Sequence, residues 1–534
     1  MPNNSEKNRR INLSNLHERS YYKWLVLAVV MIGTFISVLD ASIVNVGMPK
    51  MMAAFSVSVD KIEWVLTVYL LVRSVIFPSS GWIADHFGYK STYNLGLILF
   101  TAGSLLCSLS ANENMLIFFR VIQGAGAGFI MPVGMAIITR EFPPEQRGFA
   151  LGFWGIAAAA SISLGPMFGG YLIDRFNWNA IFDINVPIGI IGVTASWIIL
   201  REYKIPKKGK FDMLGLISMT TFLVALLLAL SDGNSAWNTG GWTSDFILSC
   251  FFIAFVSFVI FIFRELSVKN PILDLRILKN RNFGLSNIMF FIFGLAFFGN
   301  SFLLPIFLQN SLGYTALQAG LVFFPVGIIQ AIMSPIAGKM TDKLNPKIPI
   351  SIGIILTFIS MYLYKDLSLT TEYEGIILPL IIRGFGLGFM FIPLSTIAIN
   401  NIPKEKMAQA TGLFNTIRQV GGSFGVAILG TFLTRRVIFH TAMYSQSVNS
   451  NSTEFQHIQY GLKHYVQQSL GVAGNQVALR AKALIAQNLT SQAFVRGIAD
   501  DFLAGAAITA IIIIPLLFLK YNKKKKSEKV EVVE

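Results

Sequence analysis

Charged residues are scarce in this sequence. Asp, Glu, Lys and Arg make up 13% of its 534 residues, whereas a soluble domain carries about a quarter. Hydrophobic residues reach 54%, and many of them fall in blocks of about 20 residues, the length that crosses ~30 Å of hydrocarbon as a helix. The composition excludes a soluble globular protein and fits a polytopic membrane protein.

Cysteine and histidine are also scarce. The two cysteines, Cys107 and Cys250, both fall inside apolar blocks, which excludes a disulfide framework. The five histidines are scattered and lack the spacing of metal ligands. No Walker A sequence (GxxxxGK followed by Ser or Thr) occurs, so we expect no ATP site, no cofactor, no metal and no enzyme activity, with an ion gradient as the energy source.

Two glycine-rich runs, 124–129 and 384–389, superficially resemble a nucleotide-binding loop. Neither follows a strand, and both lie inside apolar blocks. Small residues at this spacing allow transmembrane helices to approach closely. We therefore interpret both runs as helix-packing motifs.

Positive charge is distributed unevenly along the chain. The formal net charge is +15, and 29 of the 43 Lys and Arg residues lie in segments that the order of spans places on one side. The positive-inside rule makes this side cytoplasmic and places both termini there. The excess charge thus reports orientation rather than a nucleic-acid partner, and the basic run 523–526 can contact anionic lipid.

The apolar blocks predict an all-α polytopic fold of about fourteen transmembrane helices. The first block is too long for the core of a cleaved signal peptide, so we expect a retained first helix. The expected helix cores are 24–49, 62–84, 91–110, 115–138, 148–172, 179–200, 212–230, 245–263, 284–309, 317–338, 348–364, 375–399, 407–433 and 498–519.

An internal repeat organises these helices. The pattern Gly-x-x-x-Asp at 81–85 recurs at 338–342, and the glycine run recurs at a similar offset of about 260 residues. Duplicated halves with a site between them are typical of transporters. We expect a six-helix half at 1–200, two inserted helices with basic flanks at 201–283, and a second half at 284–534. The second half has a long external loop at about 435–496 and a basic cytoplasmic tail.

Four motifs in the expected order give the sequence a family resemblance. It resembles the major facilitator superfamily over nearly its whole length, specifically the fourteen-helix drug:proton antiporter branch typified by EmrB and QacA. The matching positions are Asp40 and Asn45 in helix 1; Gly81, Asp85, Gly88 and Lys90 after helix 2; Arg120, Gln123 and Gly124 in helix 4; and Gly165, Pro166, Gly169 and Gly170 in helix 5. His86 and Tyr89 depart from the pattern, because the family usually has Arg there.

The resemblance implies a function. It implies two six-helix halves plus two inserted helices, and proton-coupled export of diverse amphipathic drugs by alternating access in a bacterial inner membrane. It also implies cooperation with a periplasmic adaptor and an outer-membrane channel. A dedicated exporter of an endogenous metabolite, fatty acid or lipid is the alternative with the same fold. A facilitative importer and a channel fit the motifs less well.

Asp40 and Arg120 are the expected proton-coupling residues. Asp40 lies about sixteen residues into helix 1, past the bilayer midpoint, where a carboxylate is costly and by default functional. Arg120 lies at a similar depth in helix 4, so the two can communicate across one cavity. A guanidinium keeps its charge at any working pH, so it tunes a partner carboxylate rather than carrying the proton. A purely structural role for either residue is the competing interpretation.

Further polar residues fall within the apolar blocks. Arg73 and Asp183 are unusual for the family; they either form a buried pair, which we favour, or tune ligand choice separately. Arg418 is expected to be more structural than substrate-binding. The candidates for the substrate cavity are Asn45, Arg73, Asp183, Arg383, Asn415 and Arg418.

Two further segments carry expectations. Gly165 and Pro166 interrupt the backbone hydrogen bonds of helix 5, which suits either a hinge for alternating access or a static kink. In the external segment, the stretch 476–489 places Val477, Ala481, Leu484 and Leu489 on one helical face. This face either docks a partner or rests on the membrane surface.

Overall fold

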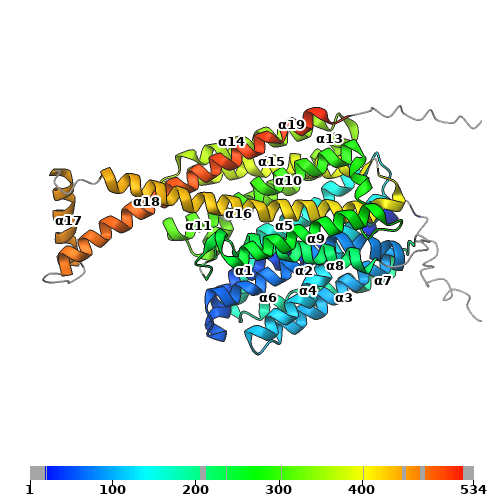
Figure 1. The fold of residues 1–534 in the computed structure, drawn as a ribbon, viewed down its shortest axis with the longest axis horizontal. Coiled ribbons are helices and arrows are strands. Elements are labelled where there is room, and N and C mark those ends of the chain that lie inside the picture. The colour runs from blue at the N-terminus through cyan, green and yellow to red at the C-terminus, as the bar shows by residue number, and fades with distance from the viewer. Residues whose placement is uncertain are drawn as a thin grey trace, which may run out of the picture.

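The structure is a computed structural model that describes residues 19, 21–204, 212–235, 237–301, 303–400, 402–447, 453–469 and 476–520. Regular structure in this part of the chain is helical, and most helices run along one long axis (Figure 1). The expected basic run 523–526 and most of the basic stretch before the insert lie outside the described residues.

The helices follow the expected blocks. The first six spans are α1 (Tyr22–Phe55), α2 (Val59–Phe87), α3 (Tyr89–Ser108), α4 (Glu113–Glu141), α5 (Arg147–Arg175), and α6 (Ala180–Asp183) with α7 (Asn185–Ile199). The inserted spans are α8 (Met213–Asp232) and α9 (Asp245–Ser267). The last six are α10 (Arg281–Ser301) with α11 (Leu303–Ile306), α12 (Ala316–Val322) with α13 (Phe324–Lys343), α14 (Lys347–Leu363), α15 (Tyr373–Asn400), α16 (Met407–Ser447), and α18 (Gln476–Ile511) with α19 (Ile513–Phe518).

The lipid environment explains why these blocks are helical. A helix satisfies its own backbone hydrogen bonds, which hydrocarbon cannot do. Among the described residues, 13 helical stretches are long and apolar enough to cross a membrane. The 20-residue α3, which packs against α4 and α7, has the length to add one more. The expected all-α fold of about fourteen spans is confirmed.

The two ends of the described chain lie at the same end of the bundle. Tyr22, at the start of α1, donates a hydrogen bond to the carbonyl oxygen of Ile199, where α7 ends, at 3.0 Å. Beyond α19, Lys520 exchanges two backbone hydrogen bonds with the side chain of Asn282, at the start of α10. An even number of spans explains this common location.

The segment 435–496, expected as a loop, is largely helical. Helices α16 and α18 continue beyond the bundle, and α17 (Thr453–Ser469) lies between them at the far end (Figure 1). At 41 residues, α16 is about 60 Å long, twice the ~30 Å of hydrocarbon. The extension of α16 and the start of α18 lack Gly and Pro, and the start of α18 is rich in the strong helix formers Ala, Leu, Lys, Arg and Gln.

The amphipathic face expected within 476–489 is present in α18. Val477 and Ala481 are buried and Leu484 and Leu489 are half-buried, while α17 packs against α18. The stretch is the continuation of the last membrane span rather than a separate helix resting on the membrane surface. We call α17 and the protruding parts of α16 and α18 the external hairpin.

The inserted helices α8 and α9 pack against each other, and α8 packs against α2 and α16. Asp212, before α8, pairs with Arg264 near the end of α9 at 3.0 Å. Lys406, before α16, pairs with Asp274 in the link after α9 at 2.6 Å. These ion pairs fasten the insert at the end of the bundle where the described chain begins and ends.

Candidate functional site

A buried ion pair joins the first and fourth helices. The Nη1 atom of Arg120 lies 2.6 Å from Oδ2 of Asp40, and both side chains are 0% exposed. The small residues of the glycine run bring α4 close to its neighbours: a Cβ on Gly124 would lie 2.9 Å from the carbonyl oxygen of Tyr69 on α2. This close approach places the long Arg120 side chain between α1 and α2.

Amides complete the surroundings of the Asp40 carboxylate. Gln123 donates from Nε2 to Oδ1 of Asp40 at 2.8 Å and to Oγ of Ser104 at 2.6 Å. Asn185, in α7, donates to the same Oδ1 at 3.1 Å. Three helices, α1, α4 and α7, therefore meet at one carboxylate, and Ser104 of α3 joins them through Gln123. We call Asp40, Arg120, Gln123, Asn185 and Ser104 the Asp40 cluster.

The guanidinium of Arg120 is held on several sides. Its Nε donates to the backbone oxygen of Val65 at 2.9 Å, and its Nη1 donates to Oε1 of Gln123 at 2.6 Å. The ring of Tyr69 lies under it, with 4.0 Å between the guanidinium carbon and the ring centroid, and the Tyr69 hydroxyl donates to the Ser37 backbone oxygen. Cation–π contact is strongest where water is excluded, as it is here.

This geometry has a direct chemical consequence. Removing one partner of a buried ion pair leaves the other charge uncompensated, at a cost of about 3–5 kcal/mol. The arrangement couples the charge state of Asp40 to the packing of four helices, because any proton reaching Asp40 weakens its contact with Arg120. Asp40 is the one carboxylate in the cluster, and its cation cannot be discharged.

The sequence alone pointed to part of this cluster. Asp40 and Arg120, expected at one depth, are in direct contact, and Gln123 belongs to the recognised helix 4 motif. Asn185 and Tyr69 were missed. A lone amide in an apolar span is a usable signal, whereas the Tyr69 ring depends on which face of α2 meets α4.

The favoured pairing of Arg73 with Asp183 is wrong. Arg73 donates to Oε1 of Gln419 on α16 at 3.3 Å. Asp183 instead accepts a hydrogen bond from Ser108, the last residue of α3, at 2.5 Å. The short helix α6 places Asp183 beside the end of α3, so the two charges lie at different depths and on different helices. Arg73 instead bridges the two halves.

The remaining cavity candidates divide between the second half and the surface. Arg383 donates to Oγ of Ser301 at 3.3 Å, and its guanidinium lies 5.1 Å from the Phe297 ring centroid. Among these candidates, Asn45 is exposed and donates to the backbone of its own helix at Ala41.

Arg418 and Asn415 lie one turn apart on α16 and are both buried. Arg418 donates to Oδ1 of Asn415 at 3.1 Å, and the Asn415 amide donates in turn to the carbonyl oxygen of Thr411. The arrangement ties the guanidinium to its own helix, in keeping with the structural role expected for Arg418.

The motif after helix 2 contacts the opposite half. Asp85 accepts hydrogen bonds from the Tyr89 hydroxyl at 2.9 Å and from the Gln409 amide at 3.3 Å. Gly81 packs directly on the backbone of Gln409, because a Cβ at Gly81 would lie 2.6 Å from its Cα. Tyr89, which replaces the family's Arg, thus supplies a neutral hydrogen bond to Asp85, while His86 stacks on the Trp82 ring.

Gly88 and Lys90 shape the turn after α2. Gly88 has a φ of 107°, a conformation that favours glycine, and an added Cβ would collide with the Glu202 carboxylate. Lys90 donates from its backbone to Glu202 at 3.0 Å and from Nζ to the Trp197 carbonyl oxygen at 2.6 Å. Both residues anchor the start of α3 to the end of α7.

The second copy of the motif makes an equivalent contact. Asp342, at the end of α13, accepts hydrogen bonds from the backbone amides of Gly148 and Phe149 in the first turn of α5, both at 2.9 Å. A carboxylate at a helix N-terminus satisfies orphan amides and interacts favourably with the helix dipole. The two halves are therefore closed against each other at the end of the bundle that carries both chain ends.

Helix α5 runs through its glycine–proline motif as one helix between the halves. Gly165 and Gly169 lie against α1, where an added Cβ would approach side chains within contact distance. Gly170 and Pro166 lie against α12 of the other half. The motif therefore allows close packing on both sides of α5 in this conformation.

Comparisons with known proteins agree with this architecture. The family model of the Major Facilitator Superfamily matches residues 30–426. The chain is 33% identical to "Uncharacterized MFS-type transporter YhcA" of Bacillus subtilis (strain 168), covering 94% of this chain and 95% of that protein. It is 32% identical to "Multidrug export protein EmrB" of Escherichia coli (strain K12), covering 92% and 94% respectively.

A third relative and a solved structure widen the comparison. The chain is 29% identical to "Fatty acid resistance protein FarB" of Neisseria gonorrhoeae, over 93% of this chain and 95% of that protein. The proton:xylose symporter XylE has the same fold, with a TM-score of 0.59 at 13% identity, over 93% of this chain and 95% of the XylE chain.

Proposed function

Because this chain belongs to the major facilitator superfamily, a family of membrane transporters, we propose that it exports amphipathic small molecules in exchange for protons. The two halves rock about the buried seams α5–α13 and α2–α16, exposing a central site alternately to each side. Multidrug export relatives that match nearly the whole chain support export of diverse substrates.

The observation that carries proton coupling is the sealed Asp40–Arg120 pair. Helices α1, α4 and α7 of the first half converge on this carboxylate, α3 joins them through Gln123, and the cation is fixed. A proton that enters Asp40 releases Arg120, and the helices that depend on the pair repack. Movement of a charge through the membrane potential adds about 2.3 kcal/mol per 100 mV for each proton.

The closed end of the bundle supports alternating access. Asp85 and Asp342 each bind the opposite half, and both contacts must break for that end to open. We place this end in the cytoplasm of a bacterial inner membrane, with both termini there and the external hairpin outside. A reporter fused after residue 534 then reads cytoplasmic, and one inserted near residue 451 reads external.

The test uses the purified full-length chain in proteoliposomes with and without a proton gradient. A panel of cationic, neutral and anionic amphiphiles, including long-chain fatty acids, is assayed for uphill movement and for proton release. Broad, gradient-dependent transport supports the drug antiporter. Transport restricted to one class of compound, such as fatty acids, supports the dedicated exporter. The similarity to a fatty acid resistance protein favours this alternative. Transport that does not depend on the proton gradient contradicts both the drug antiporter and the dedicated exporter.

We also propose that the external hairpin docks a periplasmic adaptor that leads to an outer-membrane channel. Its helices extend well beyond the bundle, where a partner can reach them (Figure 1). Deleting residues 449–474 then lowers whole-cell resistance but spares proton-driven uptake in isolated vesicles. Equal loss in both assays assigns the hairpin to the transporter's own fold.

A further inference from the structure

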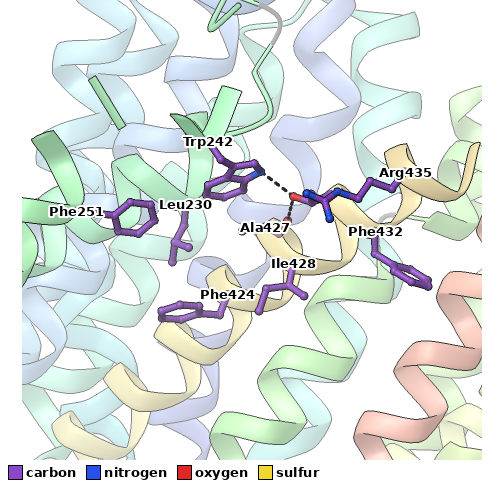
Figure 2. A pocket seen from close by; sticks show the side chains of 9 residues that line it. Leu230, Trp242, Phe251, Phe424, Ala427, Ile428, Phe432 and Arg435 are labelled. Atoms are coloured by element: carbon purple, nitrogen blue, oxygen red, sulfur yellow. Dashed lines mark hydrogen bonds between the residues drawn. The ribbon is translucent and has the colours of Figure 1, made fainter. Parts of the chain in front are cut away.

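Two adjoining cavities lie between the inserted helices and α16. The larger has a volume of about 590 Å³ and extends to α2 and α10, and the smaller has about 470 Å³. Phe251 of α9 and Phe424 of α16 line both of them, so the cavities meet at these rings. Figure 2 shows the smaller cavity, with Trp242 and Arg435 toward one end. We call the two cavities together the insert groove.

The larger cavity is lined almost entirely by apolar side chains and therefore suits a hydrocarbon chain. Of its 20 lining residues, Thr416 is the one with a polar side chain. The Thr416 hydroxyl donates to the carbonyl oxygen of Gly412 on its own helix at 2.8 Å. A polar ligand buried here would lose its hydrogen bonds to water and gain none, which disfavours its binding.

The smaller cavity has polar groups at one end, and most of them are already used. The Thr431 hydroxyl donates to Ala427 and accepts from the Trp242 indole at 2.9 Å and from the Asn234 amide at 2.8 Å. Arg435 lies one turn further along α16, is exposed, and has no hydrogen bond or ion pair with any residue that the structure describes. It is the cation left to meet a ligand.

The dimensions fit a membrane lipid. From Phe424 to Arg435, α16 rises about 16 Å at 1.5 Å per residue, which is close to half of the ~30 Å hydrocarbon core. The groove therefore runs from an interfacial cation to the middle of the membrane. Trp242, beside Thr431, is a residue type enriched at this interface.

We propose that the insert groove binds one anionic phospholipid from the leaflet on the side of the external hairpin. Its phosphate pairs with the guanidinium of Arg435, and one acyl chain lies between α9 and α16 toward Phe251 and Phe424. Arg matches phosphate geometry with two parallel hydrogen bonds. The charge of Arg435 thus favours an anionic lipid headgroup, and the apolar lining of the groove favours an acyl chain.

The groove is accessible to this occupant from the membrane. Phe255 and Phe258 of α9 and Ile428 of α16 line it and are at least 38% exposed on the side of the bundle. An unfilled apolar void of this size forfeits the dispersion contacts of its lining. The opening faces the bilayer, where lipid acyl chains are abundant and can fill the groove.

The lipid lies behind the seam between the halves. Pro78 of α2 and Thr416 of α16 line the larger cavity, and the same two helices carry the contact between Arg73 and Gln419. A chain in the groove therefore buttresses the helix pair that must move in alternating access. This consequence does not depend on which substrate the chain exports.

The experiment is photolabelling of the full-length chain in nanodiscs. The probes are phosphatidylglycerol and phosphatidylcholine carrying the same diazirine-labelled acyl chain, and the labelled peptides are mapped by mass spectrometry. We expect labels on α9 and α16 around Phe251 and Phe424. A favourable Arg contact of about 1 kcal/mol corresponds to about a fivefold preference for phosphatidylglycerol.

Three variants sharpen the result. Arg435→Gln is expected to reduce phosphatidylglycerol labelling to the level of phosphatidylcholine, whereas Arg480→Gln, which removes an exposed cation of the external hairpin, keeps the preference. Ala427→Phe fills the smaller cavity and is expected to abolish labelling by phosphatidylglycerol and by phosphatidylcholine.

Three outcomes overturn the proposal: equal labelling by the two lipids, unchanged preference in Arg435→Gln, or displacement of the label by a transported amphiphile. The last would make the groove a substrate site. None of these outcomes bears on proton-coupled export, which the proteoliposome assay tests separately.

Discussion

Two buried carboxylates in the membrane-spanning helices have opposite surroundings. Asp40, in the first half, accepts hydrogen bonds from Arg120, Gln123 and Asn185. Asp501, in the last long helix α18, is also 0% exposed, yet neither of its oxygens has a hydrogen-bond partner in the part of the chain that the structure describes. Burial alone therefore does not make an acid a candidate for proton coupling.

The neighbouring residues make the contrast sharper. Asp500 lies 2.6 Å from both Arg436 and His440, so the cation Arg436 and the His440 ring are already engaged by an acid other than Asp501. At the Asp40 cluster, the acid and its cation are both buried and depend on each other. A change of charge at Asp40 consequently strands a cation, whereas a change at Asp501 strands none. The following predictions test this difference.

The largest effect is expected for Asp40→Asn. The new amide keeps the size of the carboxylate, and Asn185, whose Oδ1 has no partner, can turn to accept from it. The protein is therefore expected to insert, but to lose uphill export and substrate-induced proton release in proteoliposomes. Asp40→Glu keeps an acid one methylene away, and partial activity is expected. Near-normal uphill transport by Asp40→Asn would make Asp40 structural and move coupling to another carboxylate.

Arg120→Gln is expected to reduce stability as well as transport. It leaves the Asp40 carboxylate buried without its cation, for which the expected loss is about 3–5 kcal/mol. The thermal unfolding midpoint in detergent measures this loss. The double variant Arg120→Gln with Asp40→Asn serves as the control, because removal of both charges is expected to restore part of the stability without restoring transport. An additive loss in the double variant would show that the two residues do not act as a pair.

Asn185→Leu is expected to have an intermediate effect. It removes one of the donors to Asp40 while Gln123 and Arg120 remain, so the expected loss is about 1.5–3 kcal/mol, with reduced proton-coupled transport. Asn45→Leu is the matched control for stability, since Asn45 is exposed and, among the described residues, bonds its own helix at Ala41. Equal effects of the two substitutions would mean that the contact with Asp40 is unimportant.

The sequence predicted how deep a residue lies in the membrane better than which neighbouring helix its side chain faces. Hydropathy predicted about fourteen spans, which agrees with the 13 membrane-length helical stretches and α3 of the described residues. Counting residues along two helices predicted a similar depth for Asp40 and Arg120, and the structure shows them in direct contact. Counting does not give the face of a helix that meets each neighbour. The Arg73–Asp183 prediction failed for this reason, because α6 is a short turn that places Asp183 beside Ser108.

Other features arise from tertiary packing or from local propensity that hydropathy does not report. The external hairpin is helical, and the start of α18 consists largely of strong helix formers, while the polarity of the segment suggested a loop. The Asp40 cluster includes Asn185, and its Arg120 rests on the Tyr69 ring. These two residues lie far apart in sequence and reach the cluster only because α7 packs on α1 and α2 packs on α4. Gln123, by contrast, could be found from the sequence, because it is part of the helix 4 motif together with Arg120 and Gly124.

The smallest effect is expected for Asp501→Asn. The substitution keeps the size of the side chain and separates no ion pair, because Arg436 and His440 are engaged by Asp500. Stability and substrate-driven proton flux are therefore expected to remain near those of the unmodified chain, in contrast to Asp40→Asn. Asp500→Asn is the internal comparison: it releases Arg436, which is one-third exposed, so a modest destabilisation is expected. If Asp501→Asn instead abolishes proton flux while the Asp40 cluster is intact, the partnered acid is not the coupling site, and the unpartnered acid of α18 takes that role.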